Sequence, residues 1–322
     1  MENFKAMENM KRLETLCIAG AVAVLAVSCG KEEAVREDGA SKVEFTASEL
    51  QVKTVFGEKA DGEYPVLWTS NEKVALFYNS QTGGQTGGGQ YADVLPSANG
   101  HTAGFSASFT DDGNGSHSFY AMSPLSALNW MGNEDWDGNG VNEKILYANI
   151  PYDQIPVPGT CDEKAQIVFA KEEFSEFPDK VDLTFSHMTA YGLITSLSLP
   201  EEATEIVGLT IESDKFLSGE IYCNYNTPET ILCNAKKAQK YIYLDVNNGG
   251  LKAKTLENVF FACTPQTDGN DVFGEGDYLK FTVYTDTDTW VKTVNFSADR
   301  TLAFKAGRIS SFSVSAHGFE KQ

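Results

Sequence analysis

Short segments in which apolar and polar residues alternate recur along most of this 322-residue chain. In the first of them, Val43, Phe45 and Ala47 alternate with Glu44 and Thr46, which is typical of a strand with one buried face. Similar segments follow at short intervals, separated by residues such as Asn, Asp, Gly and Thr. Beyond the first thirty residues, no long window carries apolar residues at helical spacing. The pattern therefore predicts an all-β protein.

The even spacing of these segments predicts a Greek-key β-sandwich in each half of the chain. Because 322 residues exceed most single cores, we expect two tandem domains, 43–178 and 179–322, with the boundary after Pro178. Besides 43–47, the predicted strands include residues 66–68, 74–78, 103–109, 118–122, 147–150, 166–170, 181–185, 191–199, 206–211, 240–246, 259–263, 278–284, 290–296 and 309–315.

Composition excludes two classes of protein. Apolar residues make up 42% of the chain and aromatic residues 11%, which is enough to build buried cores, so the chain is not disordered. Its formal net charge is −20, and a chain this acidic repels a phosphate backbone. We therefore expect no nucleic-acid partner.

The first forty residues have the pattern of an export signal. Lys11 and Arg12 precede a short apolar run, 16–27, which is followed by Ser28 and Cys29. The run is too short to span a membrane, so we expect a signal peptide over 1–28, with translation starting at Met1 or at a later methionine. Cys29 stands where a bacterial lipobox has its cysteine, which predicts lipidation at Cys29 and a flexible tether over 29–42. The alternative is an ordinary signal peptide with an incidental cysteine.

Two further sets of residues leave alternatives open. Export makes disulfides possible, and Cys223 and Cys233 flank a turn-like segment, but buried free thiols fit Cys161, Cys223, Cys233 and Cys263 equally well. Asp135, Asp137 and Asn139 match the opening of a calcium loop. The twelfth position of that loop is a leucine in place of the bidentate glutamate, so an exposed acidic loop is the favoured interpretation.

Several short motifs together carry a family resemblance. Cys29, the detached first strand, 52–54, and Trp68 with 71–77 resemble the fimbrillin superfamily of Bacteroidetes, and 150–154, 183–188 and 304–307 fit the same pattern. The resemblance implies two transthyretin-like β-sandwich domains. It also implies a pilus subunit or pilus-associated lipoprotein of the outer membrane, with a supporting role in adhesion to a host or bacterial surface receptor.

The same resemblance implies how subunits join. A trypsin-like protease removes the lipid and the first strand, and an extended segment of the next subunit fills the groove by strand addition. Val43, Phe45 and Ala47 would then be the exchangeable side chains, and 309–319 a candidate donor. The family pattern expects an arginine after the strand. Here the nearest basic residue after the strand is Lys53, whereas Arg36 precedes it, so both are candidate protease sites.

A glycan-binding surface lipoprotein is the alternative function. Trp130 and Trp136 lie in one exposed-looking segment and could stack on sugars, although tryptophans are more often core or loop anchors. We predict no enzymatic activity, no catalytic residue and no cofactor. His187 follows a predicted strand without reactive partners, so we expect it to be packed or hydrogen-bonded.

Overall fold

The computed structural model describes residues 40–47, 55–56, 66–70, 73–79, 83–84, 89–113, 115–135, 140–266 and 272–322, and 40–322 form one compact unit. These residues form strands and two short 3-10 helices, η1 (Leu125–Ala127) and η2 (Glu163–Ala165). The all-β prediction is confirmed. In the described ranges, no helix has the length and apolar content needed to cross a membrane.

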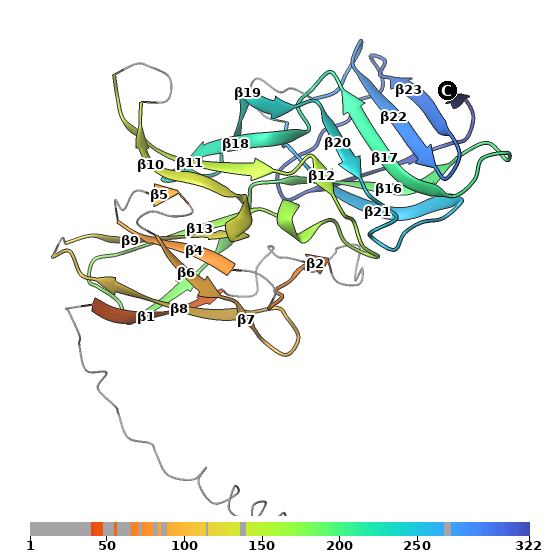
Figure 1. The fold of residues 1–322 in the computed structure, drawn as a ribbon. Coiled ribbons are helices and arrows are strands. Elements are labelled where there is room, and N and C mark those ends of the chain that lie inside the picture. Colours follow the sequence, from red (N-terminus) through yellow and green to blue (C-terminus); the bar gives the residue numbers. More distant parts are fainter. Residues whose placement is uncertain are drawn as a thin grey trace, which may run out of the picture. The chain divides into compact units, whose positions relative to one another are not determined.

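Two sheets packed face to face enclose the first core (Figure 1). The β1 sheet has the order β14-β1-β8-β7, and the β9 sheet the order β15-β13-β9-β4-β6. Their bounds are β1 Ala40–Ala47, β7 Leu95–Pro96, β8 Ala103–Thr110, β14 Lys180–Leu183, β4 Lys73–Tyr78, β6 Gln90–Asp93, β9 His117–Ser123, β13 Val168–Phe174 and β15 Phe185–His187. Side chains from alternate positions of both sheets fill the space between them, as the period of two requires.

A third sheet covers the other face of the β9 sheet. This β11 sheet has the order β19-β18-β11-β10-β5. Its bounds are β5 Gly83–Gly84, β10 Leu128–Glu134, β11 Glu143–Ile150, β18 Ser218–Asn224 and β19 Leu232–Gln239. Phe77, Tyr120 and Phe169 of the β9 sheet pack with Met131 and Leu146 of the β11 sheet in a second core. The β9 sheet is thus buried on both faces, which explains why every residue of β9 is buried.

The C-terminal part of the chain forms another pair of packed sheets. The β17 sheet has the order β12-β20-β17-β22-β23-β25, and the β16 sheet the order β21-β16-β24. Their bounds are β12 Asp153–Gln154, β20 Tyr241–Leu244, β17 Ile206–Ser213, β22 Tyr278–Thr285, β23 Thr289–Asn295, β25 Glu320–Lys321, β21 Thr255–Cys263, β16 Ala190–Ser198 and β24 Ile309–Val314; a separate ribbon pairs β2 (Val55–Phe56) with β3 (Val66–Leu67). A large apolar core lies between the two sheets.

Hydrogen bonding crosses the predicted domain boundary at residue 178. β14 and β15 lie beyond that boundary but pair with β1 and β13, which precede it. β18 likewise pairs with β11. Residues 180–187 therefore belong to the same two sheets as β1 and β13. The domain boundary at residue 178 stays a prediction.

Three strand predictions need correction. The segment 129–142 was interpreted as a loop, but its first part belongs to β10, which pairs on one side with β11 and on the other with β5; β10 ends just before Asp135. The interpretation of a single strand over 181–185 was wrong, since it is divided between β14 and β15, which belong to different sheets. The predicted strands did not include β18 and β19, although the turn that joins them was recognised.

Candidate functional site

The first strand, β1, is an inner strand of its sheet. It pairs antiparallel with β8 over its full length, from Ala40 opposite Thr110 to Ala47 opposite Ala103. On its other side it pairs parallel with β14, from Glu44 opposite Lys180 to Ala47 opposite Leu183. Figure 1 shows β1 beside β8. Removal of β1 would leave both neighbouring strands without their backbone partners.

The inward face of β1 fills the first core. Val43, Phe45 and Ala47 are exposed by 0%, 1% and 1%, respectively. The Phe45 ring lies parallel to that of Phe105, with 5.7 Å between centroids, and meets the Phe119 ring edge-on at 5.7 Å. These are favourable aromatic arrangements. The three side chains predicted to be exchangeable therefore occupy one continuous set of apolar pockets.

The outward face of β1 is polar and weakly held. The Thr46 hydroxyl donates a hydrogen bond to the Asp182 carboxylate. In the plane of the sheet, the backbone amide of Glu44 donates to the carbonyl of Asp179 at 3.0 Å. The Thr46 bond is the main cause that lowers the pKa of Asp182, with a further contribution from Lys180. An exposed ion pair joins Lys42 to Glu44 at 3.6 Å. Because exposed ion pairs contribute little, the buried face decides how tightly β1 is held.

The two ends of β1 meet different surroundings. At its C-terminal end an open hollow of about 390 Å³ lies beside Thr46 and Ala47, and Pro96, Ala103 and the 69% exposed Leu95 line it as well. At its N-terminal end, Ala40 pairs with Thr110, the last residue of β8. The β8–β9 turn follows immediately.

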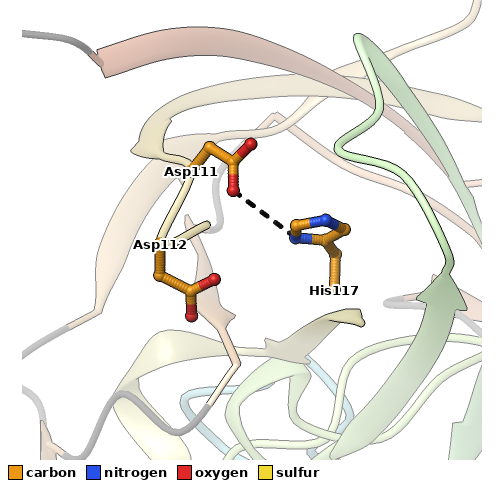
Figure 2. Close-up of side chains that lie close together, drawn as sticks. All are labelled: Asp111, Asp112 and His117. Atoms are coloured by element: carbon orange, nitrogen blue, oxygen red, sulfur yellow. Dashed lines mark ion pairs between the residues drawn. The ribbon is translucent and has the colours of Figure 1, made fainter. Parts of the chain in front are cut away.

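A polar cluster anchors the β8–β9 turn. Figure 2 shows Asp111 and Asp112 facing His117, and the Asp111 carboxylate lies 3.9 Å from His117 Nδ1. The Tyr78 hydroxyl lies 2.7 Å from the same nitrogen and donates to Asp112 at 3.1 Å. Asn79 Nδ2 also donates to Asp112, at 2.5 Å. His117 is 3% exposed, so this network satisfies a buried imidazole beside the turn.

The same cluster has the donor atoms of a metal site. One ligand atom each from Asp111, Asp112 and His117 lies within 4.8 Å of the others. Imidazole and carboxylate together suit zinc or another divalent transition metal. The Tyr78 hydroxyl is already within hydrogen-bonding distance of His117 Nδ1, which accounts for the arrangement without a metal ion.

Tyr78 predicts an alkaline weakening of the fold. Burial raises the pKa of this phenol to about 12, with further contributions from Asp112 and Asp111. The unfolded chain therefore loses the Tyr78 proton near pH 10 while the folded chain keeps it, so the free energy of unfolding falls between about pH 10 and 12. We expect Tyr78→Phe to be less stable than wild type at pH 8, and this difference to shrink by pH 11 in urea denaturation. Parallel pH dependences would contradict the assignment.

A second group of candidate site residues lies on the outer face of the β11 sheet. Trp130 of β10 is half-buried and stands opposite Tyr147 of β11, which stands opposite Tyr222 of β18. The ring centroids are 6.1 Å apart for the first pair and 5.6 Å for the second. An open groove of about 900 Å³ borders Trp130 and Tyr147. Trp136, the other predicted glycan contact, lies outside the described residues.

Other predicted site residues fall into two groups. Cys29, Arg36, Lys53, Asp137 and Asn139 lie outside the described residues, so lipidation, cleavage and the calcium loop stay predictions. Asp135 is described, and its carboxylate accepts a hydrogen bond from the Gly140 amide at 3.0 Å.

The cysteines and His187 have structural surroundings. Cys161, Cys223, Cys233 and Cys263 are free thiols, and burial raises the pKa of both Cys223 and Cys233 to about 12, which disfavours the reactive thiolate. His187 Nδ1 lies 2.8 Å from the Tyr191 hydroxyl, as expected for a hydrogen-bonded histidine. The candidate donor segment pairs within its own chain, since β24 runs parallel to β16.

Sequence reasoning missed two constellations. Tyr78, Asp112 and His117 come from three separate segments and meet only through the pairing of β4 with β9. Tyr147 and Tyr222 join Trp130 only through the register of three strands. The aromatic character of predicted strand 147–150 was the available signal for the second group, but no sequence pattern gives the pairing partner.

Comparison with known proteins finds similarity in structure only. No protein-family model matches the sequence, and no curated protein matches it either. A putative cell adhesion protein from Bacteroides uniformis is 15% identical, with a TM-score of 0.49, over 89% of this chain and 97% of that one. A putative cell adhesion protein from Bacteroides ovatus is 12% identical, with a TM-score of 0.47, over 88% and 95%. A fimbrial assembly protein from Parabacteroides distasonis is 11% identical, with a TM-score of 0.37, over 88% and 94%.

Proposed function

We propose that this chain is a non-enzymatic structural protein of a bacterial surface fimbrium, a pilus subunit or pilus-associated lipoprotein that joins other subunits by β-strand addition. The observation that carries the proposal is the position of β1. It is the first described strand of the chain, yet it lies between β8 and β14. Once cut from the residues that follow it, this strand would vacate a long groove between β8 and β14.

The vacated groove has the chemistry that strand addition requires. β8 would lose eight residue pairs and β14 four, so unpaired backbone groups would line both sides. The pockets of Val43, Phe45 and Ala47 would accept alternate apolar side chains of an incoming strand. Main-chain hydrogen bonds supply strength in this mode of recognition, and the pockets fix the register.

The donor would have to come from outside this sheet. The predicted donor, 309–319, begins with β24, which lies at one edge of the β16 sheet and contributes Val314 to the core there. An edge strand leaves a sheet at lower cost than an inner one because it has one pairing partner to lose. Its use as a donor therefore requires release from β16.

Anchoring completes the proposal. Cys29 would carry the lipid that holds the chain at the outer membrane, and Arg36 and Lys53 are the candidate cleavage points on either side of β1. Cleavage at Lys53 frees both the lipid and β1, whereas cleavage at Arg36 frees only the lipid. Cleavage at Lys53 would make this chain a shaft subunit, and cleavage at Arg36 would make it a minor or anchoring protein.

The N-terminus of the surface-assembled protein tests these roles. Filaments are sheared from cells and purified, and the first residue of this chain is determined. A start within 48–54 supports the shaft subunit, and a start at Lys42 or earlier supports a role that keeps β1. Absence of the chain from purified filaments would contradict the fimbrial proposal. As a control for anchoring, Cys29→Ser should remove the chain from the membrane fraction.

A further inference from the structure

The outer face of the β11 sheet carries an aromatic row that the fold does not need for its core. Trp130, Tyr147 and Tyr222 stand opposite one another across β10, β11 and β18, and all three are half-buried. The opposite face of these strands already supplies the second core, through residues such as Leu146 and Ile221. Neighbouring strands lie about 4.8 Å apart, so the row spans roughly 10 Å, about the length of a disaccharide.

A polar row lies directly beside the aromatic one. Glu220 of β18 is 3% exposed and accepts hydrogen bonds from the side-chain amides of Asn129 at 2.8 Å and Asn234 at 2.7 Å. Lys237 donates to the same carboxylate at 3.0 Å. Each amide gives its N–H to Glu220 and so turns its carbonyl oxygen away from that carboxylate. The buried carboxylate therefore holds three polar side chains in fixed positions along the groove.

The charges around the groove decide which ligand class fits. Glu220 pairs with Lys237, and Glu134 at the end of β10 adds a negative charge beside Tyr147. Burial, together with the charge of Glu134 and a hydrogen bond to it, raises the pKa of the Tyr147 hydroxyl. The whole chain carries a net charge of −20. An acidic ligand would be repelled, whereas an uncharged polyol would not.

We propose that this groove, of about 900 Å³, binds a neutral glycan. Sugar rings have an apolar C–H face and a rim of hydroxyls. The face stacks on the aromatic rings that line the groove, Trp130 and Tyr147, and the rim exchanges hydrogen bonds with polar side chains such as Asn129. The aromatic row therefore matches the apolar face of a sugar ring, and the polar row beside it matches the hydroxyl groups.

This inference is independent of strand addition at β1. The groove lies on the β11 sheet, and β1 belongs to a different sheet. A chain that keeps β1 would bind the glycan equally well, so failure of one proposal leaves the other standing.

The test is binding of soluble neutral polysaccharides to the full chain. Affinity electrophoresis against mannan, xylan, galactan, arabinan and mixed-linkage β-glucan identifies a ligand, and titration calorimetry then measures its Kd. We expect Trp130→Ala and Tyr147→Ala each to weaken binding roughly tenfold or more, since these aromatic side chains line the groove and aromatic anchors dominate such contacts. We expect heparin and polygalacturonate, the acidic probes, not to bind.

Tyr284→Ala is the matched control. Tyr284 is also a strand tyrosine that packs on another tyrosine, Tyr243, but it belongs to the β17 sheet. The control should bind with wild-type affinity, and all variants should retain the wild-type far-ultraviolet circular dichroism. Three outcomes would overturn the proposal: no binding to any neutral probe, undiminished binding by Trp130→Ala and Tyr147→Ala, or a loss that follows Tyr284→Ala instead. A self-association that Tyr147→Ala abolishes, without glycan binding, would also overturn it.

Discussion

Phe45→Ala should lower the free energy of unfolding by about 3–5 kcal/mol, the usual cost of truncating a buried phenylalanine. The side chain is 1% exposed, and its ring contacts those of Phe105 and Phe119, together with that of Phe109 at 6.3 Å. Truncation removes buried apolar area and leaves a cavity that three rigid rings cannot fill. Urea denaturation followed by tryptophan fluorescence measures the change.

Glu44→Ala is the control on the same strand. Glu44 points to the opposite face, and its ion pair with Lys42 is mostly exposed, so its removal should cost about 1 kcal/mol or less. The difference between the two substitutions measures how much the buried face of β1 stabilises the fold, apart from any general effect of a substitution in this strand. Equal costs for the two substitutions would mean that β1 is not packed in its groove in solution.

The sequence predicts the side chains of β1 but not its neighbours. The alternation of Val43, Phe45 and Ala47 identifies a strand with one buried face, because period two is a local property. The parallel partner, β14, lies more than 130 residues away, with Thr46 and Asp182 in contact at a separation of 136. No local pattern gives the partner or the register of such a pair. The inner position of β1 therefore follows only from the fold.

Two of the strands that the sequence missed, β10 and β19, share a physical cause. β10 contains Gly132 and ends in Asn133 and Glu134, residues that disfavour a strand when considered alone. β19 is an edge strand whose polar side chains remain largely accessible, so it lacks apolar alternation. In both cases backbone pairing with a neighbour forms the strand, and that information lies in another part of the chain.

The proposed glycan groove also combines residues that the sequence points out with a strand pairing that only the fold gives. Trp130 stands out in the sequence as one of four tryptophans, but Trp68 and Trp290 are each 3% exposed and serve the cores. Only the pairing of β10, β11 and β18 distinguishes Trp130, by placing Tyr147 and Tyr222 beside it. Residue type suggests a candidate surface, and register decides whether the surface is continuous.

Removal of β1 should cause the protein to form concentration-dependent oligomers that the uncut protein does not form. A recognition sequence for a specific protease, placed between Ala47 and Val55, would allow β1 to be cut from the chain. Mild urea followed by size-exclusion chromatography would then remove the freed strand. The vacated groove exposes the edges of β8 and β14 and a row of apolar pockets, which together template pairing with another chain.

A synthetic peptide of the β1 sequence, 40–47, should suppress these oligomers by refilling the groove. The same peptide with Phe45→Asp should be weaker by roughly two orders of magnitude or more, because burial of an unpaired carboxylate adds to the loss of the ring. Sedimentation velocity at increasing concentrations of each peptide measures how strongly that peptide suppresses the oligomers. If the cut protein stays monomeric, or both peptides act equally, the groove does not recruit strands by their alternate side chains. Strand addition would then have to be abandoned as the means by which this chain joins its neighbours.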